Sequence, residues 1–375
     1  MINRRIFSLG LGSTLLAACS TGSSTNTPAT RMQAVPNAGW DAWVAGFKGR
    51  AAAQGISQTT INTAFRGAGY LPDVIERDRN QVEFKRSLED YLAIAASDER
   101  IETGKQMLVR HAGTLSQIEA KYGVDKEVIV AVWGLESRYG ARRGDVPVVS
   151  AVSTLAYDGR RGAFFEKQLV AALKIIQDGD TTPANMTGSW AGAMGHTQFI
   201  PTSYLAYAVD FTGDGRRDIW SEDPTDSLAS TAAYLSRAGW VRGQPWGGEV
   251  GTVSGTPAAV LQPQKPGPRI AVFRNFQVIK RYNNSDSYAI GVGHLSDRIA
   301  GGPPFQASFG PDATGLTLED RKDLQRRLTS AGYDTQGADG VIGNNTKSAI
   351  SAYQRASGLP VTGEPSVALL RSLGG

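Results

Sequence analysis

Cysteine and histidine are scarce in this sequence of 375 residues, which has one cysteine, Cys19, and three histidines. A single cysteine excludes a disulfide within the chain and any zinc site built on cysteines. The histidines are scattered and form no HExxH pattern, which argues against a zinc hydrolase. The sequence also lacks a large excess of positive or negative charge. Its formal net charge is +4, and without Arg4 and Arg5, which lie in the leader described below, it is +2. Nucleic acid is therefore not an expected partner.

The composition excludes several other classes of protein. The sequence is 41% hydrophobic and 20% charged, which is ordinary for globular protein and unlike disordered, collagen-like or multispan membrane proteins. A chain of this length is long enough for two or three domains, each with its own core.

Residues 1–18 have the features of an export signal. They contain paired arginines, a short apolar stretch at 6–18 and small residues before the cysteine. The apolar stretch is too short to span a membrane. The run Leu16-Ala17-Ala18-Cys19 resembles a lipobox, in which a signal peptidase cuts before the cysteine and the new N-terminus is acylated. An ordinary secretory signal that happens to contain cysteine is the alternative, but the position and uniqueness of Cys19 favour a lipoprotein.

The residues around the lipobox bear on the destination of the chain. Ser20 stands where an aspartate would retain a lipoprotein in the inner membrane, so the resemblance implies an outer-membrane lipoprotein that faces the periplasm. Arg4-Arg5 followed by Ile6-Phe7 also resembles a twin-arginine export signal. Residues 19–35, rich in Ser, Thr, Asn and Pro after the cysteine, cannot bury a core and are predicted to form a flexible tether.

Helical periodicity dominates the rest of the chain, so the fold is predicted to be mainly α. Apolar residues recur at spacings of three and four from Trp40 to about Arg110. Further helices are predicted at 106–122, 126–136, 162–177, 201–210 and 226–238. Short runs broken by Gly and Pro at 246–290 predict a small strand or loop subdomain. Gly and Pro at 301–313 predict a linker, which divides a large domain at 36–300 from a compact domain at 314–375.

One buried-helix pattern leads directly into a carboxylate. Residues 128–135 are almost wholly apolar and continue into Glu136-Ser137-Arg138-Tyr139-Gly140. A carboxylate at the end of such a helix is expected to be desolvated, which raises its pKa and keeps it protonated near neutral pH. The alternative is a solvated glutamate paired with Arg138, and this segment alone does not decide between the two.

Four motifs in order carry a resemblance to a known family. Residues 188–204, GSWAGAMGHTQFIPTSY, resemble the Gly-Ala-Met-Gly-x-x-Gln-Phe-x-Pro-Ser pattern of lytic transglycosylases. Their spacing after the Glu-Ser-x-Tyr-Gly motif also fits. With TLAYDGRR at 154–161 and RYNNSDSY at 281–288, the sequence resembles the membrane-bound lytic transglycosylase B family. The resemblance extends from about Trp40 to Asp297.

This resemblance implies a lysozyme-like α+β catalytic domain that cleaves the MurNAc–GlcNAc β-1,4 bond of peptidoglycan without water. Glu136 would act as general acid on the glycosidic oxygen and then as base toward the C6 hydroxyl of MurNAc, which closes a 1,6-anhydro ring. Most glycosidases use two carboxylates. One carboxyl is sufficient here because the substrate supplies its own nucleophile.

The resemblance also implies a set of substrate-binding residues. Ser189 and Gln198 would hydrogen-bond the sugar or the catalytic carboxyl, and Arg160 and Arg161 would contact the lactyl or peptide part. The residues expected to line the sugar cleft are Tyr282, Asn283, Tyr288 and Tyr234. Aromatic rings suit the C–H faces of sugars. Without the motifs, each tyrosine would be interpreted as a core residue, and Met194 is expected to pack near the cleft rather than to act in catalysis.

The segment 210–218 resembles an EF-hand loop. Oxygen ligands stand at loop positions 1, 3 and 5 in Asp210, Thr212 and Asp214, and Gly215 stands at position 6. Position 12 is Ser221 rather than glutamate, so the resemblance implies closure by a later aspartate, with Asp226 favoured over Asp223. The hypothesis is a structural calcium ion; the alternative is a metal-free turn, favoured by the positive charges of Arg216 and Arg217.

The last sixty residues carry a second resemblance. LQRRLTSAGY at 324–333, ADGVIGNNT at 338–346, AISAYQ at 349–354 and GLPVTG at 358–363 resemble the peptidoglycan-binding domain 1, a three-helix module. Its acidic and basic residues nearly balance, so binding is expected to depend on shape and hydrogen bonds. A structural cap is the alternative.

Two other functions stay open at this point. A non-catalytic peptidoglycan-binding scaffold would keep the fold, although Glu136, Ser189 and Gln198 argue against it. A hydrolytic muramidase would use water with Asp145 or Asp158 as the second acid. The expected partners are peptidoglycan glycan strands and outer-membrane lipid through acylated Cys19, with cell-wall synthases as further candidates. No cofactor is expected to be required.

Overall fold

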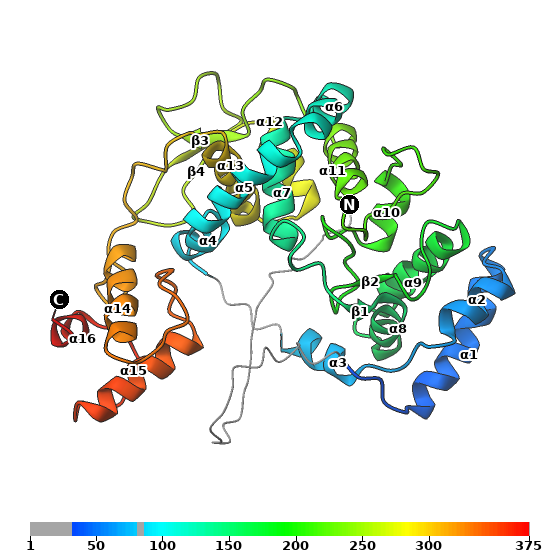
Figure 1. The fold of residues 1–375 in the computed structure, drawn as a ribbon, viewed down its shortest axis with the longest axis horizontal. Coiled ribbons are helices and arrows are strands. Elements are labelled where there is room, and N and C mark those ends of the chain that lie inside the picture. The colour runs from blue at the N-terminus through cyan, green and yellow to red at the C-terminus, as the bar shows by residue number, and fades with distance from the viewer. Residues whose placement is uncertain (1–31, 81–85, 375) are drawn as a thin grey trace. The chain divides into compact units, whose positions relative to one another are not determined.

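The computed structural model describes residues 32–80 and 86–374 of the chain (Figure 1). Within these residues the protein is mainly α, as the sequence predicts, with only short strands. Two compact units alternate along the sequence: one contains residues 32–80 and 107–240, and the other contains 86–106 and 241–374. We call them the Glu136 unit and the C-terminal unit. The helix α5 (Asp98–Arg110) extends from the second into the first.

The predicted leader, the lipobox with Cys19 and most of the predicted tether lie outside the described residues. Near the first described residue, Val35 forms a β-bridge with Tyr70, whose carbonyl accepts a hydrogen bond from Val35 N at 2.9 Å. In the ranges that the structure covers, no helix is both long and apolar enough to cross a membrane.

The Glu136 unit is a helical assembly with one two-stranded ribbon. Its helices are α1 (Ala38–Ala53), α2 (Gln58–Phe65), α3 (Pro72–Arg79), α6 (Ala112–Tyr122), α7 (Lys126–Ser137), α8 (Val148–Asp158), α9 (Gly162–Gln177), α10 (Pro201–Tyr207) and α11 (Thr225–Arg237). The ribbon pairs β1 (Val146–Pro147) with β2 (Thr187–Gly188). The helices predicted at 126–136, 162–177 and 226–238 are confirmed, whereas the single helix predicted at 106–122 is wrong, because the chain leaves helical geometry at His111.

Helix α7 lies in the core of this unit. Every residue from Val128 to Gly134 is buried, and α6 and α11 pack against the helix. Such all-round burial explains why the sequence of α7 is apolar on every face rather than amphipathic. Burial also fixes the position of the helix end, where Glu136 is found.

The C-terminal unit combines a small sheet with helices. Its three-stranded antiparallel sheet has the order β3 (Gly247–Glu249), β5 (Ile270–Val272), β4 (Ala259–Leu261). The helices before the last module are α4 (Leu88–Ala95), α12 (Arg274–Tyr282) and α13 (Asp286–Ile299). The strand or loop subdomain predicted at 246–290 is therefore correct only up to Val272. The remainder is helical, because Phe273 and Ser285 provide extended N-caps and the Gly and Pro residues that break helices lie upstream.

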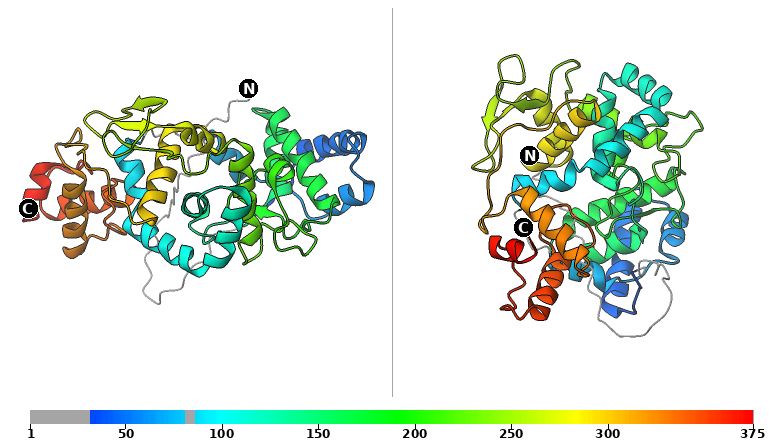
Figure 2. Two further views of the ribbon diagram at one scale, coloured as in Figure 1. Left: turned by 90° about the horizontal axis from the view of Figure 1, so that it is seen from above. Right: turned by 60° about the vertical axis from the view of Figure 1, so that its left-hand side comes forward.

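The predicted three-helix module at the C-terminus is confirmed. Helices α14 (Leu318–Ser330), α15 (Asn344–Ala356) and α16 (Val367–Ser372), orange to red in Figure 2, pack together. Their shared core consists of Leu316, Leu324, Leu328, Ala349, Ile350, Leu369 and Leu370.

A buried arginine fixes this module to the rest of the C-terminal unit. Arg321 on α14 is 3% exposed. Its guanidinium donates to Glu89 at 2.7 Å and Asp90 at 3.0 Å on α4, and to Asp312 at 3.0 Å in the segment before the module. Its Nε donates to the carbonyl of Gly340 at 2.7 Å. Three carboxylates and a carbonyl thus offset the cost of burying this charge.

The segment 301–313, predicted to be a linker, has neither helix nor strand but is held in place. Both carboxylate oxygens of Glu249 accept backbone hydrogen bonds, from Gln306 at 2.6 Å and from Ala307 at 2.9 Å. The ring of Phe305 stacks on His294 with centroids 4.1 Å apart. The module is therefore attached by specific contacts.

Replacing Arg321 is expected to destabilise the C-terminal unit strongly. Arg321→Met leaves the buried carboxylate of Glu89 without its partner, and breaking a buried pair in this way costs about 3–5 kcal/mol of unfolding free energy. The matched control is Arg326→Met on the same helix, where the ion pair with Asp323 is exposed and 3.6 Å long; we expect a change below about 0.5 kcal/mol there. Calorimetric unfolding measures both.

Adding Glu89→Gln to Arg321→Met should recover part of the loss, because it removes the orphaned buried charge. Equal stability of Arg321→Met and Arg326→Met would contradict a clamping role for Arg321.

Candidate active site

Glu136 is the second-last residue of α7 and is partly exposed. The chain turns sharply directly after it, because Arg138 and Tyr139 both adopt positive φ values, 51° and 56°. Such backbone is unfavourable for residues with a Cβ and is characteristic of functional sites. Ser137 stabilises the turn: its Oγ accepts from Gly140 N at 2.9 Å and its carbonyl accepts from Arg142 N at 2.8 Å.

The motif at 188–199 forms a closed loop that follows β2. Ser189 N donates to the Ala193 carbonyl at 2.7 Å, and Ala193 N donates back to Ser189 Oγ at 3.1 Å. Met194 and Phe199 exchange backbone hydrogen bonds at 2.9 and 3.0 Å. Met194 is completely buried, so it packs inside the loop, which agrees with its expected packing role.

Two side chains of α7 hold this loop, and both bond to His196. Ser137 Oγ donates to the His196 carbonyl at 2.5 Å, and Trp133 Nε1 donates to His196 Nδ1 at 3.1 Å. The imidazole lies so close to Gly140 that a Cβ there would come within 2.6 Å of Nδ1. The glycine of the Glu-Ser-x-Tyr-Gly motif therefore makes room for the histidine of the second motif.

Arg143 extends the same network. Its Nη1 donates to the Ser221 carbonyl at 2.8 Å and lies 3.0 Å from His196 Nε2. Its own carbonyl accepts from Gln198 Nε2 at 3.0 Å, and Gln198 Nε2 also donates to the Gly195 carbonyl at 2.9 Å. Two backbone carbonyls therefore orient the amide of Gln198, one within the loop at Gly195 and one outside it at Arg143.

The partners of His196 determine its charge. An indole N–H can only donate and a carbonyl can only accept, so Nδ1 is unprotonated toward Trp133 and Nε2 donates to the Ser221 carbonyl at 2.8 Å. Burial has the largest effect on the pKa of His196 and lowers it; the Ser221 carbonyl raises it, Arg143 lowers it, and Glu222 and Asp223 raise it, so that the pKa lies below its usual value. His196 is therefore neutral in the folded protein.

The structure places the two predicted arginines at the start of α9. Arg160 forms a two-point ion pair with Asp78 at 2.7 Å, and Asp78 is 2% exposed. The guanidinium of Arg161 lies over the ring of Phe164, 4.7 Å from its centroid. Arg160 is thus already engaged with a buried carboxylate.

The four remaining predicted residues lie in different units. Tyr234 is buried in α11, where its ring contacts Phe199 of the loop. Tyr282 ends α12 and Tyr288 is in the first turn of α13; both are buried, and Asn283 between them is half-buried. The structure therefore brings Tyr234 together with the 188–199 loop and groups the other three at the α12–α13 junction of the C-terminal unit.

The segment 210–226 satisfies its carboxylates internally. Asp210 accepts from Gly213 N at 2.6 Å and Gly215 N at 2.9 Å. Asp226, 2% exposed, accepts from the backbone of Phe211, Thr212 and Asp218. Asp214 accepts from Arg216 N at 2.9 Å. Among residues 32–80 and 86–374, no three His, Cys, Asp or Glu side chains group as metal ligands, and backbone N–H groups hold the carboxylates of this loop.

Sequence reasoning missed Trp133, Arg143 and His196 as parts of the site. His196 stands inside a recognised motif and Trp133 three residues before Glu136, so their positions could have drawn attention to them. Arg143 contacts Ser221 and Gln198 across long stretches of sequence, and nothing in the pattern points to it.

Comparison with known proteins identifies the class. The sequence matches the Transglycosylase SLT domain family over residues 39–265 and 252–297, and the putative peptidoglycan binding domain over residues 317–373. The chain belongs to the Transglycosylase SLT domain family and carries a C-terminal peptidoglycan-binding domain.

Individual relatives are similar over different parts of the chain. Membrane-bound lytic murein transglycosylase B of Escherichia coli (strain K12) is 33% identical over 234 residues, which are 54% of this chain and 64% of that protein. SltB3 from Pseudomonas aeruginosa in complex with NAG-NAM-pentapeptide is 41% identical with a TM-score of 0.70, over 90% of this chain and 100% of SltB3. Escherichia coli lytic transglycosylase SLT35 in complex with calcium is 27% identical with a TM-score of 0.59, over 68% and 92%. The lysozyme-like, mainly α fold is thereby confirmed.

Acid is expected to weaken the attachment of the loop to α7. The unfolded chain protonates His196 below about pH 6.5, whereas the folded chain resists protonation. The contribution of His196 to stability is therefore complete above about pH 6.5 and falls by up to about 1.4 kcal/mol per pH unit below it. The measurement compares wild type with His196→Gln, whose amide can accept from Trp133 and donate to Ser221 but does not titrate.

The melting temperature of wild type relative to His196→Gln should fall between about pH 7.5 and pH 5. His111 and His294 are unchanged in both proteins, so their titrations cancel. Parallel pH profiles would refute the neutral, doubly bonded state of His196.

Calcium is expected to have little effect on stability. An ion that binds only the folded state with a Kd of about 1 µM would add about 4 kcal/mol at 1 mM, whereas the carboxylates of the 210–226 loop already have backbone partners. We expect the melting temperature of chelator-treated protein to change by less than about 1 °C on adding 1 mM calcium. A rise of several degrees that Asp210→Asn abolishes would establish a structural calcium site.

Proposed function

We propose that this protein is a lytic transglycosylase of peptidoglycan that uses Glu136 as its single acid and base. The observation that carries the proposal is the attachment of the 188–199 loop to the end of α7 through Ser137 and Trp133, the neighbours of Glu136 on that helix. The family match and the name of the Escherichia coli relative, a lytic murein transglycosylase, support the same reaction class.

The proposed reaction has two proton transfers and needs no water. Glu136 donates its proton to the oxygen of the MurNAc–GlcNAc bond as the C1–O bond breaks, and the N-acetyl group of MurNAc assists at C1. The Glu136 carboxylate then accepts the proton of the MurNAc C6 hydroxyl as O6 bonds to C1. The carboxyl is regenerated, and one fragment ends in 1,6-anhydroMurNAc.

The proposed roles of the neighbouring side chains come from the resemblance to lytic transglycosylases, and the contacts of some of them are compatible with these roles. Ser189 and Gln198 present hydroxyl and amide groups whose orientation is fixed by the loop backbone. Arg161 contacts the lactyl or peptide part of the glycan, with Arg160 beside it held by Asp78. We propose that Tyr282, Asn283 and Tyr288 line the sugar cleft and that Tyr234 contributes by supporting the loop.

A hydrolytic muramidase would need a second acid that activates water and is free to accept a proton. Asp158 accepts a hydrogen bond from Arg79 at 2.6 Å, which makes it the weaker candidate. Asp145 is exposed and is the better candidate for the second acid of this alternative.

We propose the following organisation for the whole chain: a leader at 1–18, an acylated Cys19 with a tether to 35, a catalytic domain at 36–300, a connecting segment at 301–313 and a peptidoglycan-binding domain at 314–375. The proposed location is the periplasmic face of the outer membrane, with peptidoglycan as substrate and cell-wall synthases as candidate protein partners.

Replacing Glu136 is expected to remove activity without loss of stability. Glu136→Gln keeps the volume but can neither donate nor accept the transferred proton, and general acid–base assistance is worth roughly 10²–10⁴ in rate. The measurement is release of soluble fragments from purified sacculi, with the melting temperature taken on the same sample. Glu127→Gln, in the first turn of the same helix, is the matched control and should keep wild-type activity. An active Glu136→Gln variant would show that the acid is elsewhere.

Replacing Cys19 by Ala is expected to abolish acylation. One acyl chain alone gives marginal membrane binding, so stable anchoring requires the full lipid modification. The variant should move from the membrane fraction to the soluble fraction of cells. Its retention in the membrane fraction, released only by detergent, would contradict lipid anchoring at Cys19.

A further inference from the structure

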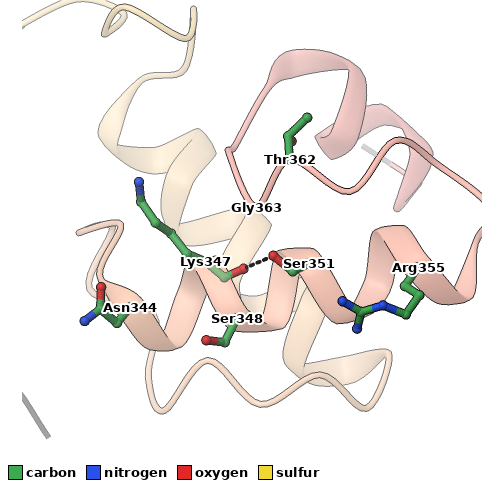
Figure 3. A pocket seen from close by; sticks show the side chains of 7 residues that line it. All are labelled: Asn344, Lys347, Ser348, Ser351, Arg355, Thr362 and Gly363. Carbon is green, nitrogen blue, oxygen red and sulfur yellow. Dashed lines mark hydrogen bonds between the residues drawn. The ribbon is translucent and has the colours of Figure 1, made fainter. Parts of the chain in front are cut away.

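The C-terminal module contains a groove along one side of α15. Its volume is about 470 Å³. Asn344, Lys347, Ser348, Ser351 and Arg355 form a stripe along the helix, as expected for residues three and four apart. The loop residues Thr362 and Gly363 form the opposite side (Figure 3).

The groove is rigid because Gln354 fixes the loop against the helix. Gln354, 6% exposed, accepts from the backbone N–H groups of Thr362 and Gly363 at 2.9 Å each and donates to Thr362 Oγ1 at 2.9 Å. Gly363 has a φ of 68°, and a Cβ there would come within 2.7 Å of Ser351 Oγ. A preformed groove loses little conformational entropy when a ligand binds.

The chemistry of the lining suits a peptide better than a sugar. None of the lining side chains is aromatic, whereas aromatic faces are the usual partners of sugar rings. Ser351 Oγ donates to the Lys347 carbonyl at 2.9 Å and can still accept from a peptide N–H. Thr362 Oγ1 accepts from Gln354 and from Glu364 N and can still donate to a peptide carbonyl.

The charged residues of the groove suit a carboxylate. Arg355 is exposed and has no ion pair among the described residues, and guanidinium groups bind carboxylates in a two-point geometry. Lys347 is paired with Glu364 at 2.7 Å, and both side chains are largely exposed. A ligand carboxylate can therefore take the place of Glu364 at modest cost.

The length of the stripe matches a short peptide. From Asn344 to Arg355 the helix rises by about 16 Å, at 1.5 Å per residue. An extended peptide covers that distance with about five residues, at roughly 3.3 Å each.

We propose that this groove binds the peptide part of peptidoglycan as an extended chain of about five residues, with Arg355 pairing with a peptide carboxylate. The proposal rests on the proposed peptidoglycan function and gives the C-terminal module a ligand separate from the sugar chain. Thr362 and Ser351 bond the peptide backbone, and Glu364 occupies Lys347 when no peptide is bound.

The test is an NMR titration of the full-length protein with a synthetic stem pentapeptide that has a free C-terminal carboxylate. The amide signals of Thr362 and Gly363 report on the groove itself and are expected to shift saturably. Arg355→Ala should weaken the affinity obtained from these signals by about 5- to 10-fold. Arg371→Ala, which removes the same charge from α16 of the module, is the matched control and should leave the affinity unchanged.

Two further measurements test whether the group bound by the groove is a carboxylate. Amidating the C-terminus of the peptide should weaken binding to wild type about as much as Arg355→Ala does, and should add no further loss in that variant. Glu364→Gln should strengthen binding about twofold, because it frees Lys347. Absence of shifts at Thr362 and Gly363, or equal affinity of wild type and Arg355→Ala, would overturn the proposal.

A peptide-free glycan oligomer distinguishes the alternative ligand. If it shifts the same two signals and competes with the peptide, the groove is a sugar site and the proposal is wrong. Cleavage of sacculi, measured on the same protein, reports separately on the proposed catalytic function. Cleavage without peptide binding would overturn only the proposed peptide ligand of the groove. Peptide binding without cleavage would overturn only the proposed catalytic function.

Discussion

The proposed active site depends on the attachment of one loop to the end of one helix. Ser137 and Trp133, on either side of Glu136 in α7, both bond to His196 in the 188–199 loop. One bond uses the backbone carbonyl of His196 and the other uses its ring, so the loop is attached to the helix at two points. The strained turn after Glu136 is stabilised by the same serine, whose Oγ accepts from Gly140. The attachment of the 188–199 loop to the helix end that carries Glu136 therefore depends on a buried histidine.

The C-terminal unit depends on the buried charge of Arg321. Arg321 joins α14 to α4 and to the segment before the module, and Glu249 holds residues 306 and 307 of that segment. A module attached in this way samples far fewer positions than a module on a free chain. The effective concentration of its groove near other sites of the same unit therefore depends on these contacts rather than on the length of a linker. The α12–α13 junction with Tyr282, Asn283 and Tyr288 belongs to that unit.

Much of the fold could be predicted from local pattern. The apolar run at 128–135 predicted the buried α7, and the turn motifs of the last sixty residues predicted the three-helix module. Both elements could be predicted because they depend on short-range patterns in the sequence. The helices α12 and α13 were missed, since Gly and Pro upstream obscured where the strands end. The motif contains His196 but does not show its bonding partners, because these lie between 25 and 63 positions away in the sequence. Arg321 and Glu89 are 232 positions apart, and no sequence pattern connects them. The role of Glu136 comes from a resemblance, and its chemistry stays a prediction.

The most direct test of the account is the origin of the oxygen at the newly formed glycan ends. If Glu136 transfers the proton of the C6 hydroxyl and that hydroxyl attacks C1, water takes no part in the reaction. Digestion of sacculi in H₂¹⁸O, followed by mass spectrometry of the released fragments, should give 1,6-anhydroMurNAc ends that are lighter by one water than hydrolytic products and contain no ¹⁸O. Reducing MurNAc ends labelled with ¹⁸O would contradict the account and establish a hydrolase.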